Sequence, residues 1–123
     1  MGQKNMIINN ELQLYKGLTF EEFKKNSLFD NQVDNRFFWI EKDCKIIELS
    51  HVFRIGLWFN GGLLRQARLF CDDDSIQNEE EREVIHNNIV NEILDKFDIK
   101  SEDIQAYYSK REQYSSIFID YTK

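Results

Sequence analysis

Hydrophobic and polar positions alternate in several short segments of the chain, which is the pattern of half-buried β-strands. The clearest segment is a hairpin at 51–71, in which HVFRIGLWF leads through NGG into LLRQARLFC. A three-residue loop at 60–62 makes one face apolar except at Arg65; it sets Phe59 opposite Leu63, Leu57 opposite Arg65, Ile55 opposite Ala67 and Phe53 opposite Leu69. A two-residue loop at 60–61 would pair Ile55 with Gln66 and Phe53 with Arg68. That register buries more polar groups, so we favour the three-residue loop.

Two segments carry the signals of a helix start. Thr19 and Glu22 have the spacing of a capping box, with Leu18 and Phe23 placed as a hydrophobic staple, which predicts a helix at about 20–28. A longer helix is predicted over 79–97, because Asn78 is a good N-cap and three glutamates follow it. Its apolar stripe consists of Ile85, Ile89, Ile93 and Phe97, broadened by Val84, Val90 and Leu94.

The remaining segments predict further strands. They are expected at 6–15, at 36–41 (RFFWIE), at 45–50 (KIIELS) and at 114–121 (YSSIFIDY). A tight turn at 42–44 would join the second and third of these, and 29–35 reads as a polar loop. Residues 103–109 either pair with the last strand or form a short helix capped by Ser101, and the pattern does not decide between them.

This order of elements predicts an α+β fold for a single domain spanning 1–123. Consecutive strands joined by short turns form an antiparallel sheet, here of about five strands. Two amphipathic helices are expected to pack on one face of it.

The net charge of the 123 residues is −6, which argues against tight binding of nucleic acid. An acidic balance suits a soluble protein or one with a basic partner. No segment is apolar for long enough to span a membrane, and no secretion signal opens the chain, so we expect a cytoplasmic protein. Cys44 and Cys71 are expected to be buried, reduced thiols.

No catalytic or metal-binding motif is complete, so we expect neither an enzyme nor a cofactor. The two histidines, His51 and His86, stand in no triad signature, and His86 is placed on the exposed side of its helix. Glu83 and His86 form only one half of a di-iron motif. The segment from Asp72 to Glu83 has the length of a calcium loop but lacks its glycine and one ligand.

Two surface features remain as candidates for binding a partner. One is the acidic block, which comprises Asp72, Asp73, Asp74, Glu79, Glu80, Glu81 and Glu83. The other is the sheet face opposite the helices, where Val52, Arg54, Gly56 and Trp58 would face Leu64, Gln66, Arg68 and Phe70, with Arg54 directly across from Arg68. A solvated loop and a half-solvated sheet are the plain alternatives. The residues predicted to contact the partner are Asp72, Asp73, Asp74, Glu79, Glu80, Arg54, Trp58 and Arg68.

In four segments the chain resembles, in overall style, the small cytoplasmic immunity proteins encoded beside polymorphic and contact-dependent growth inhibition toxins. These segments are LTFEEFKKNSLF, RFFWIE, IGLWFNGGLLRQARLF and NEEEREVIHNNIV. The resemblance implies a non-catalytic protein that binds one cognate toxin domain, expected to be a nuclease, and blocks its active site. It assigns no role to an individual residue. The alternatives are a phage or mobile-element protein that antagonises a host nucleic-acid-binding protein, and a small enzyme or ligand-binding domain with an unrecognised pocket.

Overall fold

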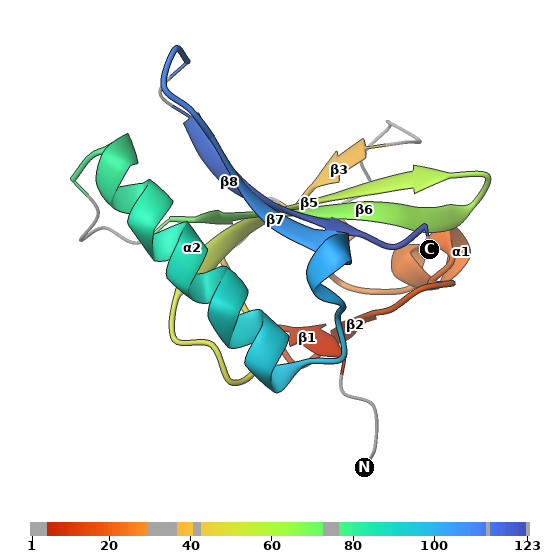
Figure 1. Cartoon of the computed structure of the whole chain (residues 1–123). Helices are drawn as coiled ribbons and strands as arrows, with labels where there is room; N and C mark the ends of the chain where they lie inside the picture. Colours follow the sequence, from red (N-terminus) through yellow and green to blue (C-terminus); the bar gives the residue numbers. More distant parts are fainter. Residues whose placement is uncertain (1–4, 30–36, 41–42, 73–76, 113, 123) are drawn as a thin grey trace.

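The computed structural model describes residues 5–29, 37–40, 43–72, 77–112 and 114–122 (Figure 1). Its elements in chain order are β1 Met6–Ile8, β2 Leu12–Leu14, α1 Phe20–Lys24, β3 Phe37–Trp39, β4 Cys44–Lys45, β5 Val52–Asn60, β6 Leu63–Cys71, α2 Glu79–Lys96, the 3₁₀ helix η1 Ser101–Asp103, β7 Ile104–Ser109 and β8 Tyr114–Asp120.

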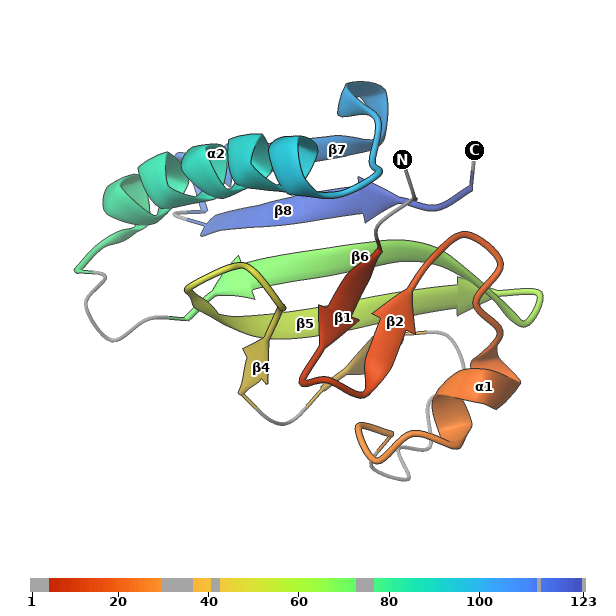
Figure 2. The same ribbon diagram turned by 90° about the horizontal axis from the view of Figure 1, so that it is seen from below.

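Six strands form one antiparallel sheet in the order β3-β5-β6-β8-β7, with β4 also paired to β5. The helix α2 packs against β7 and β8, and the β1–β2 pair and α1 lie on the same side of the sheet (Figures 1 and 2). We call this side the inner face and the opposite side the outer face. The α+β fold with both helices on one face is confirmed, with six strands in the main sheet.

The inner face carries the core. Fully buried side chains of β5 and β6 line it, and phenylalanines of α1 pack onto them. The rings of Phe23 and Phe59 stack with centroids 5.5 Å apart, and Phe20 stacks on Phe38 at 5.1 Å. Each such ring pair contributes about 0.5–1.5 kcal/mol beyond the area that it buries.

The predicted start of α1 is confirmed, but the helix ends earlier than residue 28. Thr19 Oγ1 accepts the backbone N–H of Glu22 at 3.1 Å, as a capping box requires. After Lys24, the side chain of Asn26 accepts the N–H of Leu28 at 3.0 Å. Asparagine thus offers the backbone an alternative to the next helical bond, which stops the helix.

The single strand predicted at 6–15 is wrong, because the chain folds back within it. Asn9 and Asn10 have φ of 52° and 58°, a left-handed conformation that asparagine tolerates well. The turn lets β1 pair with β2, and it buries the four apolar side chains Met6, Ile8, Leu12 and Leu14.

The predicted hairpin between 36–41 and 45–50 is also wrong. β3 and β4 do not pair with each other; both pair with β5, at Gly56–Trp58 and at Val52–Phe53 respectively. The second strand ends at Lys45, and the chain turns at Glu48, whose φ is 76°. The predicted loop at 29–35 lies outside the described residues except for Phe29.

The predicted hairpin at 51–71 exists, but its register and its loop differ from the prediction. The turn is Gly61-Gly62, Asn60 pairs with Leu63, and Leu57 pairs with Ala67 in place of Arg65. A bulge next to Phe59 leaves Arg65 out of the ladder, so Leu64 turns into the core. The bulge removes the one charged side chain that the predicted register placed on the apolar face. Beyond the bulge the shift is two residues, so residues 66–71 keep their predicted faces. Leu64 was predicted on the outer face, and this placement is wrong because the bulge turns it into the core.

In the C-terminal part of the chain, the structure agrees closely with the elements predicted from the sequence. Asn78 Oδ1 accepts the N–H of Glu81 at 2.8 Å, and α2 runs to Lys96, one residue short of the predicted end. Residues 104–109 form strand β7, preceded by η1, and this strand pairs along its length with β8.

Candidate functional site

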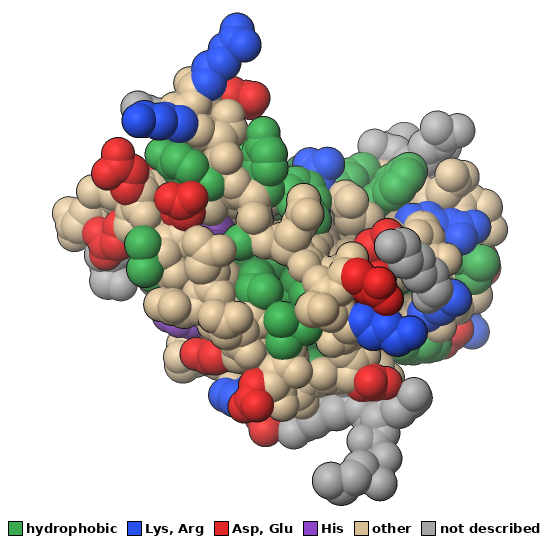
Figure 3. All heavy atoms as spheres, viewed as in Figure 1, with side chains coloured by type: hydrophobic (Ala, Val, Ile, Leu, Met, Phe, Trp, Pro, Cys, Tyr) green, Lys and Arg blue, Asp and Glu red, His purple; other side chains and the backbone are tan. Residues whose placement is uncertain are grey.

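The outer face of the sheet carries many aromatic side chains, and no described helix or strand covers it except at Phe70, whose ring contacts His86 and Arg82 of α2. The side chains on it come from five strands; they are Phe37, Trp39, Arg54, Trp58, Gln66, Arg68, Phe70, Tyr107, Tyr114 and Phe118. Figure 3 views this face from the side, along the upper edge of the molecule, where hydrophobic side chains flank a basic one. Trp39 and Tyr107 are the exposed aromatic side chains of this set, and the other rings are half-buried beside them. Apolar surface of this kind is typical of interaction sites.

Arg68 lies at the centre of the outer face between two aromatic rings. Its guanidinium carbon is 5.2 Å from the centroid of Phe37 on one side and 4.9 Å from that of Phe118 on the other. Its Nε donates to Gln66 Oε1 at 3.3 Å. Each cation–π contact contributes about 0.5–1 kcal/mol, and together they hold a normally flexible side chain in one position. We call the three residues the Phe37–Arg68–Phe118 stack.

Gly56 makes this stack possible. It is the register partner of both Trp39 and Arg68, and a Cβ atom here would lie 2.7 Å from Phe37 Cζ and 3.3 Å from Trp39 Cε3. The missing side chain therefore lets the two rings of β3 lie across β5. The ring of Phe37 reaches Arg68 over the glycine.

A hollow of about 340 Å³ opens beside the stack, lined by Trp39, Ile40, Arg54, Phe70 and Tyr114. The rings of Phe70 and Tyr114 stack at 6.2 Å and form one of its walls. Trp39 is 39 % exposed, which is high for an aromatic side chain of this size. The arrangement can accept a large side chain from another protein.

Arg54 and Asp72 join the outer face to the acidic block. Arg54 Nε is 3.2 Å from Asp72 Oδ2, and both side chains remain substantially exposed. Arg54 is paired across the strands with Phe70, whereas Arg68 is paired with Gly56. The predicted direct opposition of the two arginines is therefore wrong, and the carboxylate beside Arg54 offsets its charge.

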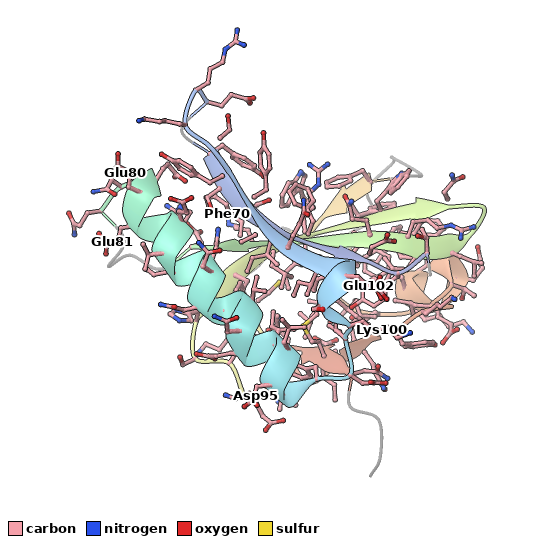
Figure 4. The ribbon with its side chains drawn as sticks, in the orientation of Figure 1. Phe70, Glu80, Glu81, Asp95, Lys100 and Glu102 are labelled. Carbon is pink, nitrogen blue, oxygen red and sulfur yellow. The ribbon has the colours of Figure 1, made fainter. Side chains whose placement is uncertain are left out.

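Beyond Asp72, the described residues of the acidic block belong to the first turns of α2. Asp73 and Asp74 fall outside the described residues. Glu79 pairs with Arg82 at 3.0 Å, and Glu80 lies exposed at the beginning of α2, where Figure 4 shows it beside Glu81. The structure thus places Asp72, Arg54, Trp58 and Arg68 on the outer face. Glu79 and Glu80 lie apart from them, at the N-terminal end of α2.

His86 is buried, and its predicted place on the exposed side of α2 is wrong. Its Nε2 accepts the backbone N–H of Cys71 at 3.0 Å, and its Nδ1 lies 2.7 Å from Ser115 Oγ. Burial, reinforced by the nearby charge of Arg82, lowers the pKa of this histidine to about 4. Since both ring nitrogens are held in internal hydrogen bonds, His86 has a structural role and is not placed to act as a general base.

The described part of the chain offers little for other chemistry. No group of three His, Cys, Asp or Glu side chains within it could hold a metal ion. Burial raises the pKa of the Cys44 thiol to about 11, so this cysteine stays protonated at neutral pH. Among the helices described, none is long and apolar enough to cross a membrane.

The sequence analysis missed the contributions of β3, β7 and β8 to the outer face. Phe37 and Trp39 alternate with the buried Phe38 and Ile40, and this alternation could have placed them on the same face as Trp58. Tyr107 and Phe118 required the pairing of β7 with β8, which the sequence left undecided.

Comparison of the chain with protein-family models, with curated proteins and with solved structures finds no match.

Proposed function

We propose that the protein is a non-catalytic inhibitor that binds another protein through the outer face of its sheet. We further propose that it is an immunity protein of the cytoplasm, whose partner is a cognate bacterial toxin domain with nuclease activity. The observation that carries the binding role is the Phe37–Arg68–Phe118 stack on the outer face of the sheet. The resemblance of the sequence to immunity proteins supports the identity of the partner.

The composition of the outer face supports protein binding over other roles. Tryptophan, tyrosine and arginine are the residues most enriched in binding hot spots. Here Trp39 packs against Phe37, Arg68 lies between Phe37 and Phe118, and Tyr107 contacts Phe118. These contacts restrict the side chains before binding, which reduces the entropy lost on association. A rigid, preorganised aromatic surface suits a tight inhibitor.

The charge of the molecule supports a basic partner. Nucleases bind anionic phosphates and are commonly basic near their active sites. A net charge of −6 would attract such a domain over a distance, while the aromatic side chains supply the buried area after contact. Asp72 beside Arg54 places one carboxylate at the rim of the hollow.

Protection of growth tests this function. A candidate toxin domain, chosen from reading frames adjacent to the one that encodes this protein, is expressed in a susceptible strain with this protein or with its Arg68→Glu variant. Wild-type protein should restore growth, and the variant should fail while remaining folded by circular dichroism. Restoration by neither protein, or by both equally, would count against the proposal.

A further inference from the structure

Strand β7 forms an open edge of the main sheet. Its six residues, Ile104–Ser109, pair with β8 on one side, and no described strand pairs with it on the other. The segment IQAYYS contains neither proline nor charge, which are the usual means of protecting a sheet edge. The opposite edge is protected, because β3 and β4 are short and separate. Among the described strands of the main sheet, β7 is therefore the edge strand best suited to receive another strand.

The hydrogen-bonding groups of β7 can be assigned to its two sides. Tyr121 N–H donates to Arg65 O on β6 at 2.8 Å, and successive residues of a strand point their backbone groups to opposite sides. Ile117 and Ile119 thus face β6, while Ser116 and Phe118 face β7 and bond to their partners Tyr107 and Gln105. It follows that Ile104, Ala106 and Tyr108 direct their N–H and C=O groups to the open edge.

A hollow lies along each face of this edge. On the outer face, a hollow of about 390 Å³ extends from Glu102, Gln105 and Tyr107 across β8 to Gln66 on β6. On the inner face, a hollow of about 240 Å³ is lined by Asn78, Glu79, Glu80 and Tyr108. Because side chains of a strand alternate between faces, an added strand would place successive side chains in the two hollows.

Both hollows are acidic. Glu102 lies at the beginning of β7, and Glu80 lies near its end, at the beginning of α2 (Figure 4). Desolvation and the negative charges of Glu80, Glu83 and Glu79 raise the pKa of Tyr108, in agreement with their proximity to this edge. Lysine and arginine side chains would complement these carboxylates.

We propose that the β7 edge accepts an extended basic segment of the partner protein as an additional antiparallel or parallel strand. This inference rests on the proposed function, since it gives the partner a second contact beside the outer face. A second copy of the chain is a poorer occupant. Antiparallel pairing of two β7 strands would bring the Glu79–Glu80 end of one copy toward Glu102 of the other, and like charges across a strand pair are destabilising.

Hydrogen exchange measured by NMR tests the inference with a defined probe. The probe is a peptide of about ten residues that alternates lysine and valine, and its control alternates glutamate and valine. In the free protein, the amides of Ala106 and Tyr108 should exchange faster than those of Gln105 and Tyr107, which bond to β8. The lysine peptide should slow exchange at Ala106 and Tyr108 by about tenfold or more, and the glutamate peptide should not.

Two variants separate strand addition from simple charge attraction. Ala106→Pro removes one edge N–H without breaking the ladder to β8, so it should weaken peptide binding by about tenfold. If this variant unfolds, a lysine peptide N-methylated at alternate residues replaces it, because it keeps the charge but cannot pair as a strand. Equal binding of the methylated and unmethylated peptides would overturn the proposal.

Other results would overturn it as well. These are absent protection at Ala106 and Tyr108, equal binding of the glutamate peptide, or a dimeric free protein in which both amides are already protected. Displacement of the peptide by single-stranded RNA that itself protects these amides would assign the edge to nucleic acid instead.

If edge protection occurs but outer-face variants leave toxin binding intact, the proposed function fails and strand addition stands. If outer-face variants block the toxin but the peptide protects nothing, strand addition alone fails.

Discussion

His86 Nε2 accepts the backbone N–H of Cys71 at 3.0 Å, at the place where β8 leaves β6. The β6–β8 ladder ends at the pair Leu69 and Ile117, two residues before Cys71. The same helix supplies Arg82, which donates to Cys71 O, and His86 also contacts Ser115 on β8. Two side chains of α2 thereby replace the backbone bonds that the diverging strand no longer provides.

This relationship predicts that the protein loses stability in mild acid. The pKa of His86 is about 4 in the folded protein and 6.5 without the fold, so the unfolded chain binds the proton more readily. The contribution of neutral His86 to the free energy of unfolding is complete above about pH 6.5 and is lost as the pH falls toward 4. The free energy of unfolding falls by about 3 kcal/mol at most. Urea denaturation across this range measures the loss. The His86→Gln variant should show a shallower pH dependence than the wild-type protein, and equal slopes for the two proteins would contradict the assignment.

The capping box of α1 should contribute measurably to stability. Thr19→Ala removes the oxygen that accepts the N–H of Glu22, and the loss should lower the free energy of unfolding by about 1 kcal/mol. Lys25→Ala, an exposed substitution at the other end of the helix, is the matched control and should change it by less than about 0.5 kcal/mol. Identical urea midpoints for the two variants would show that the cap does not matter.

Gly56→Ala should destabilise the protein even though alanine is the better residue within a strand. The added methyl group would lie 2.7 Å from Phe37 Cζ, so the ring must leave its place over β5, at a cost of about 1 kcal/mol or more. Adding Phe37→Leu should recover most of this loss, and the double-mutant cycle measures the coupling. A Gly56→Ala protein more stable than wild type would show that the Phe37 ring can move aside without a cost in stability.

The sequence predicted the parts of the fold that local signals determine. The caps at Thr19 and Asn78, the apolar faces of β5 and β6 and the α+β class follow from residue spacing alone. The Asn9-Asn10 turn carried a usable signal that was overlooked, since consecutive asparagines tolerate positive φ. The position of His86 was also available, because residues 86, 89, 93 and 97 share one helix face.

Other features depended on tertiary structure and could not be read from the sequence. The bulge that excludes Arg65 is set by the competition between burying a charge and keeping a regular ladder. The pairing of both β3 and β4 with β5 depends on β5 being long enough to hold both. The Phe37–Arg68–Phe118 stack unites three strands, so it emerges only when the order β3-β5-β6-β8 is known.

The binding affinity of outer-face variants for the cognate toxin domain tests the central claim most directly. Trp39→Ala and Arg68→Ala remove an aromatic anchor and the centre of the stack, while Ile47→Ala removes an equally exposed side chain from the loop beside β1. Calorimetry should show the dissociation constant raised about tenfold or more for the first two variants and changed less than about twofold for Ile47→Ala. Folded Trp39→Ala and Arg68→Ala proteins that bind the toxin with wild-type affinity would contradict the account.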